Sequence, residues 1–90
     1  MDLNNSKLAE ILKDLRKESG YTQLDLASRL GISRETVSAV ENNKRSTIES
    51  LGLEVCNKWW AVCRTKARKN TRDRFMEQIM GYFKFLSDKL

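Results

Sequence analysis

The side chains that carry acid–base, metal or nucleophilic chemistry in most enzymes are nearly missing from this sequence. It contains no histidine and two cysteines, Cys56 and Cys63, which are seven positions apart. In a helix this spacing separates the two backbones by about 10 Å, too far for a disulfide bond. Zinc sites are usually filled by several Cys and His ligands, so we expect no metal. We interpret both cysteines as small apolar residues in a reducing cytosol, and we expect no cofactor and no enzymatic activity.

The chemistry that remains is positive charge and hydrogen bonding. Lysine and arginine outnumber the acidic residues by 17 to 12. The excess lies mainly in residues 46–90, which carry nine basic and five acidic side chains. A basic balance attracts polyanions, so nucleic acid is the first partner to consider and an anionic membrane surface the second. Because moderately basic domains without such a partner are nearly as common, charge alone does not decide the function.

The elements that must position any functional side chain are helices, because the apolar residues recur with a helical period and no segment has a strand pattern. The predicted helices are residues 6–19, residues 23–30, residues 34–41, a long helix that starts after a Thr47 cap and whose apolar stripes include Trp59 and Cys63, and residues 72–89. They predict an all-α fold, a compact helix-turn-helix bundle of about four to five helices with a C-terminal helical extension. Residues 1–66 are the expected domain and residues 67–90 the extension.

The segment between the second and third predicted helices has the composition of a tight turn. Thr22 and Ser33 can cap the starts of these two helices. Gly31 can adopt the left-handed conformation that ends the second helix. The small Ala27 lets the helices cross closely, and Ile32 supplies an apolar contact in the turn. The sequence therefore predicts two short helices joined by a glycine turn.

Here the sequence resembles the XRE family of Cro- and phage-repressor-like regulators, over about residues 7–55. The matching segments are residues 12–23, Leu26-Ala27, Leu30-Gly31-Ile32-Ser33 and Val37-Ser38-Ala39-Val40-Glu41-Asn42. The family usually has a glycine where this chain has Asn43, and a proline before the fourth helix where this chain has none. The resemblance does not extend to the tail from about Trp59 onward. It implies a helix-turn-helix DNA-binding domain.

The resemblance implies that the third predicted helix is a recognition helix whose N-terminal half faces base edges in the major groove. Arg34 is the main candidate, because a guanidinium can form a bidentate contact with guanine. Glu35 can accept a hydrogen bond from a cytosine amino group or orient Arg34. The implied base-reading residues are Ser33, Arg34, Glu35, Ser38 and Ala39. The alternative is an ordinary solvated helix face.

The resemblance also implies contacts with DNA phosphates and a structural ion pair. Gln23 is similar to the family residue that holds a phosphate at the start of the second helix. The implied phosphate contacts are Thr22, Gln23, Asn42, Lys44 and Arg45. Arg16 and Glu41 are expected to form a partly buried pair that links the first and third helices.

The last predicted helix carries an apolar stripe rich in aromatic residues, a composition typical of subunit interfaces. Modules of this kind commonly bind paired half-sites as dimers. We therefore expect a homodimer whose interface contains Phe75, Ile79, Tyr82, Phe83 and Leu86. The alternatives are that this helix packs on Trp59 or Trp60 of the same chain, or that it binds a protein partner. The basic stretch Arg64–Arg74 is expected to be solvated, with a supplementary DNA contact as the alternative.

From these residues we expect a sequence-specific, double-stranded-DNA-binding transcriptional regulator. The leading hypothesis is a repressor or autoregulator from a phage, a plasmid or another mobile element, which binds a two-fold operator as a dimer. A restriction–modification controller is a close variant, and an antitoxin-type module whose tail sequesters a partner protein is the second hypothesis. No window approaches the about 20 apolar residues of a membrane span, and Met1–Ser6 do not form a signal peptide. We expect a cytoplasmic, nucleoid-associated protein without a membrane partner.

Overall fold

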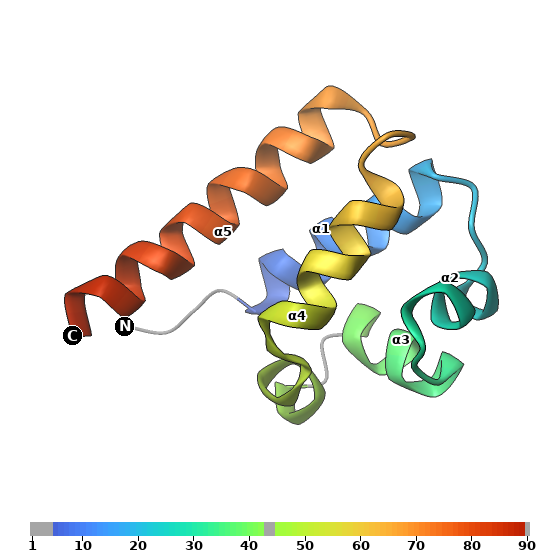
Figure 1. Ribbon diagram of the computed structural model, residues 1–90, viewed down its shortest axis with the longest axis horizontal. Helices are drawn as coiled ribbons and strands as arrows, with labels where there is room; N and C mark the ends of the chain where they lie inside the picture. Colours follow the sequence, from blue (N-terminus) through green and yellow to red (C-terminus); the bar gives the residue numbers. More distant parts are fainter. Residues whose placement is uncertain (1–4, 43–44, 90) are drawn as a thin grey trace.

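Five helices make up the part of the chain that the computed structural model describes, residues 5–42 and 45–89 (Figure 1). They are α1 (Asn5–Glu18), α2 (Gln23–Leu30), α3 (Arg34–Glu41), α4 (Arg45–Cys63) and α5 (Lys69–Lys89). Side chains are described for residues 7–42 and 54–80. These ranges contain no strand, and the predicted all-α class is confirmed. None of the described helices combines the length and hydropathy that a bilayer crossing demands.

The two short helices begin and end where local signals predict. The Thr22 hydroxyl accepts a hydrogen bond from the Asp25 backbone N–H at 3.0 Å, and the Asp25 carboxylate accepts one from the Thr22 N–H at 3.2 Å. The Ser33 hydroxyl caps α3 by accepting from the Thr36 N–H at 3.1 Å. Gly31 ends α2 at φ +72°, a left-handed conformation that side chains with a Cβ rarely adopt. Each helix is therefore closed by residues next to it in the sequence.

The two long helices begin earlier than predicted. Helix α4 starts at Arg45, so Thr47 lies inside it and is not its cap. Helix α5 starts at Lys69 rather than at residue 72. Its cap comes from another helix: the Glu18 carboxylate of α1 accepts from the Arg68 N–H at 2.8 Å and from the Thr71 hydroxyl at 2.7 Å. This carboxylate satisfies groups at the start of α5 that the local sequence does not.

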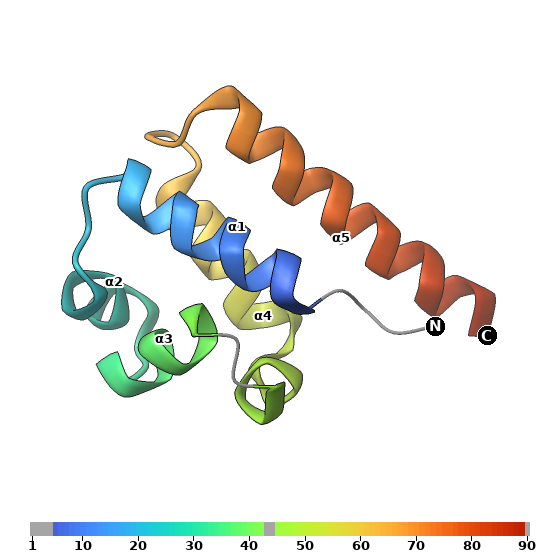
Figure 2. The same cartoon turned by 180° about the vertical axis from the view of Figure 1, so that it is seen from behind.

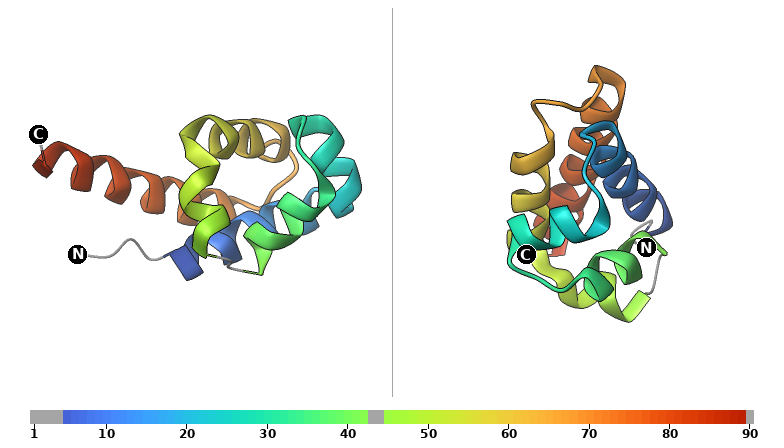
Figure 3. Two further views of the ribbon diagram at one scale, coloured as in Figure 1. Left: turned by 90° about the horizontal axis from the view of Figure 1, so that it is seen from below. Right: turned by 90° about the vertical axis from the view of Figure 1, so that its right-hand side faces the viewer.

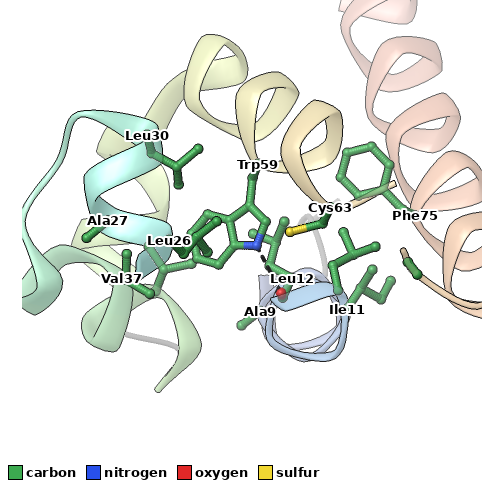
Figure 4. Packing of buried hydrophobic residues seen from close by; sticks show 13 residues of the cluster. Ala9, Ile11, Leu12, Leu26, Ala27, Leu30, Val37, Trp59, Cys63 and Phe75 are labelled. Atoms are coloured by element: carbon green, nitrogen blue, oxygen red, sulfur yellow. Dashed lines mark hydrogen bonds between the residues drawn. The ribbon is translucent and has the colours of Figure 1, made fainter. Parts of the chain in front are cut away.

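The hydrophobic core is centred on Trp59, which is fully buried between the helices (Figure 4). Its indole N–H donates to the Leu12 carbonyl of α1 at 3.0 Å, so the polar end of the ring has a partner. The other core side chains include Ile11 and Leu15 of α1, Leu26 and Leu30 of α2, Val37 and Val40 of α3, Cys63 of α4 and Phe75 of α5. All five helices therefore contribute to one core.

Helix α5 runs antiparallel to α1, and its second half extends past the other helices (Figures 2 and 3). The direction follows from the contacts, since Thr71 meets Glu18 near the end of α1 whereas Arg74 meets Asp14 and Glu10 earlier in it. The Arg74 guanidinium lies 3.1 Å from the Asp14 carboxylate and 3.6 Å from that of Glu10. Ion pairs and the cap thus attach the first half of α5 to α1.

Phe75 belongs to the core of its own chain, and its prediction as a dimer-interface residue is wrong. Its side chain is 2% exposed and its ring stacks on Trp60, with 4.7 Å between ring centroids and 4° between ring planes. Ala67 and Thr71 are buried beside it. The first part of α5 therefore covers Trp60 in the same chain, and the core continues past residue 66. At the start of α5, the apolar stripe that was predicted to contact a second subunit packs against the core of its own chain.

Candidate nucleic-acid interface

Helix α3 has a buried side that holds it in the bundle and an exposed side at its N-terminal end. Val37 and Val40 are fully buried against the core. Ser33, Arg34 and Glu35 are exposed. The two valines fix α3 to the core, so the polar side chains of its first turn are held in place while they face solvent. This is the geometry that an element needs in order to enter a DNA groove.

The predicted base-reading residues at the start of α3 differ in whether they already form hydrogen bonds within the chain. Arg34 and Glu35 have no described hydrogen bond within the chain, so both side chains are available to a partner. The Ser33 hydroxyl instead caps the helix and shares a 2.8 Å hydrogen bond with the Thr36 hydroxyl. Ser33 therefore has a structural task that limits its freedom to contact a base.

Ser38 and Ala39, the other two predicted base readers, lie at the half-buried end of α3. The Ser38 hydroxyl accepts from the Asn42 side-chain amide at 3.2 Å, and the Asn42 backbone N–H donates to the Ser38 carbonyl at 2.9 Å. Asn42 itself is exposed. This end of the helix is thus closed by a local hydrogen-bonded pair, next to the start of the loop that leads to α4.

Arg16 of α1 and Glu41 of α3 form a buried, bidentate ion pair. The guanidinium donates through Nε to Glu41 Oε2 at 2.6 Å and through Nη2 to Oε1 at 2.9 Å. The two side chains are 11% and 1% exposed. Arg16 also donates to the Tyr21 carbonyl at 2.9 Å. Parallel hydrogen bonds of this kind fix geometry, so the pair locks the end of α3 and the loop before α2 onto α1.

Gln23 joins the same network from the start of α2. Its side-chain amide donates to Glu41 Oε1 at 3.2 Å, and the residue is half-buried. The adjacent Thr22 is exposed, with its hydroxyl oxygen accepting the α2 cap. An amide nitrogen carries two N–H groups, so Gln23 retains a donor beyond the bond to Glu41. The predicted phosphate contacts Thr22 and Gln23 thus lie together at one helix N-terminus, where backbone N–H groups favour anions.

The carboxylate at the start of α2 is held in its charged form. The backbone N–H of Thr22 and then its side chain lower the pKa of Asp25, and the positive charge of Arg29 lowers it further. Burial acts in the opposite direction and is outweighed. The Asp25 charge therefore serves the cap of α2.

The two cysteines are buried thiols, in line with their interpretation as apolar helix residues. Burial raises the pKa of Cys56 to about 11 and also raises the pKa of Cys63. Both are neutral at physiological pH, and a neutral thiol is a poor nucleophile and a poor metal ligand. Among the described residues, no group of three acidic or cysteine side chains is arranged to hold a metal ion.

Several predicted site residues are outside the described part of the structure. Lys44 lies outside the described residues, and Arg45 is the first residue of α4 with its side chain undescribed. The side chains of Tyr82, Phe83 and Leu86 are likewise not described. Ile79 is half-buried and packs on the core. The structure therefore brings together Arg16, Thr22, Gln23 and Glu41, while the predicted loop and dimer contacts remain predictions.

One cluster near this interface was not predicted. The Tyr21 ring lies under two cations, with Arg29 Cζ 4.7 Å and Lys66 Nζ 4.9 Å from its centroid. Lys66 belongs to the turn between α4 and α5, far from Tyr21 in the sequence. The only sequence signal was the basic stretch that contains Lys66, and charge without a contact partner does not predict which residues meet.

Comparison with known proteins agrees with this geometry. A family model described as "Helix-turn-helix" matches residues 12–52, which comprise most of α1, all of α2 and α3, and the start of α4. This match is consistent with an XRE-type helix-turn-helix segment at residues 12–52. The predicted resemblance is thereby confirmed over this part of the chain. The match ends before Trp59 and α5.

Two curated relatives share the same region. The antitoxin HipB of Escherichia coli strain K12 is 40% identical over 42 residues, which are 47% of this chain and 48% of HipB. The antitoxin HipB of Escherichia coli O6:H1 is also 40% identical over 42 residues, which cover 47% of this chain and 45% of that protein. The alignment thus spans about half the length of each relative. No solved structure matches this chain.

Proposed function

We propose that this chain is a sequence-specific regulator of transcription that binds double-stranded DNA by inserting the first turn of α3 into the major groove. The observation that carries this proposal is the exposed pair Arg34 and Glu35 on a helix anchored by Val37 and Val40. Neither polar side chain has a described hydrogen bond or ion pair within the chain, whereas Val37, Val40 and Glu41 of the same helix are buried. A helix held in this way can meet base edges without reorganising.

In this proposal Arg34 is the main base reader. Its guanidinium forms a bidentate contact with guanine O6 and N7, and Glu35 accepts from a cytosine amino group or orients Arg34. Ala39 packs on a thymine methyl group, and Ser38 contacts the same groove. Ser33 contributes chiefly by capping the helix that carries these residues.

Contacts with phosphates set the position of the protein on the duplex. Thr22 and the free N–H of Gln23 face one strand at the start of α2, and the bond from Gln23 to Glu41 holds the amide in a single orientation. Asn42, Lys44 and Arg45 contact the other side of the groove. Such contacts carry affinity and register but little sequence information.

The active form in this proposal is a homodimer on a two-fold operator, and its occupancy of a promoter makes it a repressor or an autoregulator. The second half of α5 supplies the interface, because it extends past the other helices (Figure 3) and carries Tyr82, Phe83 and Leu86 in its sequence. Two modules related in this way contact half-sites about 34 Å apart, one turn of DNA.

Selection from a random duplex library, followed by sequencing, tests the proposal. The expected result is a two-fold symmetric motif whose half-sites are about one helical turn apart. A protein that binds no duplex at low salt contradicts DNA binding altogether, because the phosphate attraction is strongest there. A motif without symmetry retains DNA binding but contradicts the dimer on paired half-sites.

The names of the two relatives favour a second candidate function, that of an antitoxin. In this form the chain binds a partner protein through α5 while α3 binds DNA, so the two functions are compatible. Co-expression with the protein encoded by the adjacent gene tests it. A stable complex that is lost when residues 81–90 are deleted supports the antitoxin function, and independent elution of the two proteins contradicts it.

A further inference from the structure

The basic stretch between α4 and α5 consists of residues with different partners. Lys69 pairs with Asp73 at 3.0 Å, and Arg74 pairs with Asp14 and Glu10 of α1. Lys66 is exposed and has no salt bridge to a described carboxylate; its contact is with the ring of Tyr21. Arg74 therefore links α5 to α1 and Lys69 pairs within α5, whereas Lys66, like Arg64 and Arg72, forms no salt bridge to a described carboxylate.

Arg29 approaches the same ring from α2. Because Arg29 Cζ and Lys66 Nζ are 4.7 Å and 4.9 Å from the Tyr21 centroid, the two charges lie within about 10 Å of each other. The electron-rich face of the ring attracts each cation, but the two cations repel one another. Asp25 of α2 accepts a hydrogen bond from the Thr22 N–H and is attracted by the charge of Arg29, but the two side chains form no described salt bridge. A polyanion would relieve this repulsion.

The position of the pair relates it to the DNA interface. Tyr21 immediately precedes Thr22 and Gln23, the phosphate contacts of the proposed function, and its carbonyl is held by Arg16. Neighbouring Cα atoms are about 3.8 Å apart, and a DNA strand presents a phosphate about every 3.4 Å along the helix axis. A strand that passes the start of α2 therefore reaches Tyr21 within a few nucleotides.

We propose that Arg29 and Lys66, held over Tyr21, form a phosphate-binding ridge that contacts the DNA backbone flanking the half-site read by α3. This inference rests on the proposed function and extends its footprint beyond the family segment, because Lys66 lies outside residues 12–52. Tyr21 is a positioning residue whose ring contacts both cations. The ridge gives affinity and salt dependence without reading sequence.

The test measures how affinity falls with salt for full-length variants on a selected duplex. One duplex carries flanks of about 10 base pairs on both sides of the site, and a second is trimmed to the site. Lys66→Gln and Arg29→Gln each remove one cation. Lys58→Gln is the matched control, because it removes the same charge from an exposed lysine of α4 that pairs with Glu54 at 3.7 Å.

On the flanked duplex, each ridge variant is expected to lower the slope of log affinity against log salt by about 0.9, the value for one phosphate contact. The trimmed duplex and Lys58→Gln are expected to show no such change. Tyr21→Phe is expected to keep the wild-type slope, whereas Tyr21→Leu, which keeps the apolar packing but loses the ring face, is expected to lower it.

Equal slopes for wild type and both ridge variants on the flanked duplex overturn the ridge while leaving α3 as the DNA-binding element. A loss of binding to poly-glutamate without any change in DNA slope also overturns it, and assigns the cations to an acidic protein surface. If the wild-type protein binds no duplex, the proposed function itself fails, which is a different outcome from failure of the ridge.

Discussion

Individual residues in α3 and its neighbours divide into those that hold the fold and those that face outward. Val37, Val40 and Glu41 are buried, and each has packing or ionic partners inside the molecule. Arg34 and Glu35 are exposed and have no such partners among the described residues. Substitution of the outward residues therefore changes recognition with little effect on folding, whereas substitution of the buried ones changes stability first.

Arg34→Ala is expected to weaken binding to the selected site by about 1–3 kcal/mol, because it removes a bidentate base contact. Binding to random DNA is expected to change little, since phosphate contacts remain. Fluorescence anisotropy titrations with the two duplexes measure both affinities. Equal losses on the two duplexes would mean that Arg34 contacts the backbone rather than a base.

Arg16→Met is expected to lower the free energy of unfolding by about 3–5 kcal/mol, because it leaves the Glu41 carboxylate buried without its partner. Urea unfolding followed by circular dichroism measures the change. Lys58→Met is the control: it breaks an exposed pair with Glu54 and is expected to change stability by less than about 1 kcal/mol. A similar small change for both variants contradicts a structural role for the Arg16–Glu41 pair.

Among the elements, α5 depends on a residue that is distant in the sequence. The Glu18 carboxylate caps the N-terminus of α5, and the hydrogen bonds of this cap lower the pKa of Glu18. Burial raises the pKa, but the hydrogen bonds from Thr71 and Arg68 and the charges of Arg68 and Arg74 outweigh burial, so the pKa of Glu18 lies below its ordinary value of 4.5. A carboxyl whose pKa is lowered by folding stabilises the fold above its unfolded pKa, and this contribution is lost as pH falls through the folded value.

Glu18→Gln is expected to be less stable than wild type at neutral pH and to lose less stability on acidification. The difference between the two proteins is expected to shrink below pH 4.5, where the wild-type carboxylate becomes protonated. Urea unfolding from about pH 7 to about pH 3 measures it. Glu77→Gln, which removes an exposed carboxylate of α5 but not its cap, is the control. A constant difference across this range contradicts a charged cap.

The contrast between elements explains what the sequence predicts and what it does not. Helices α2 and α3 were predicted with their observed bounds because Thr22, Gly31 and Ser33 act on neighbouring residues. The start of α5 was not predicted, because the residue that caps it, Glu18, belongs to α1. For the same reason the helical pattern identified Phe75 as apolar but not the surface that it covers.

In the candidate site too, contacts between helices were difficult to predict from the sequence. The Arg16–Glu41 contact was expected from the family resemblance rather than from local chemistry, and the structure contains it. The bond from Gln23 to Glu41 and the cations over Tyr21 were not expected, because they join residues from separate helices and turns. Local spacing predicts which side of a helix is apolar, but contacts between elements depend on how the helices pack.

On the scale of the whole molecule, the helix-turn-helix segment and the first half of α5 share one core, and among the described helices the second half of α5 extends away from it (Figure 3). The dimer proposal therefore concerns residues after Met80. Ile79 and Phe75 pack internally, so a shortened chain that keeps them retains the contacts of the core.

Deletion of residues 81–90 is expected to leave a folded monomer that binds a two-fold operator more weakly than the full chain does. The fold is expected to persist because Phe75 still covers Trp60. Sedimentation at matched concentrations measures the oligomeric state, with the full chain as the dimeric reference. A truncated protein that still sediments as a dimer would show that the dimer interface lies outside residues 81–90.

The stacking of Phe75 on Trp60 has a consequence for any ligand that acts on the tail. Trp59 is enclosed by the core, whereas Trp60 is shielded on one face by a single ring from α5. An event that lifts α5 away from α1 would expose Trp60 to water while Trp59 stays dry, shifting the emission of one indole and not the other. Tryptophan fluorescence is therefore expected to distinguish release of α5 from unfolding of the other helices.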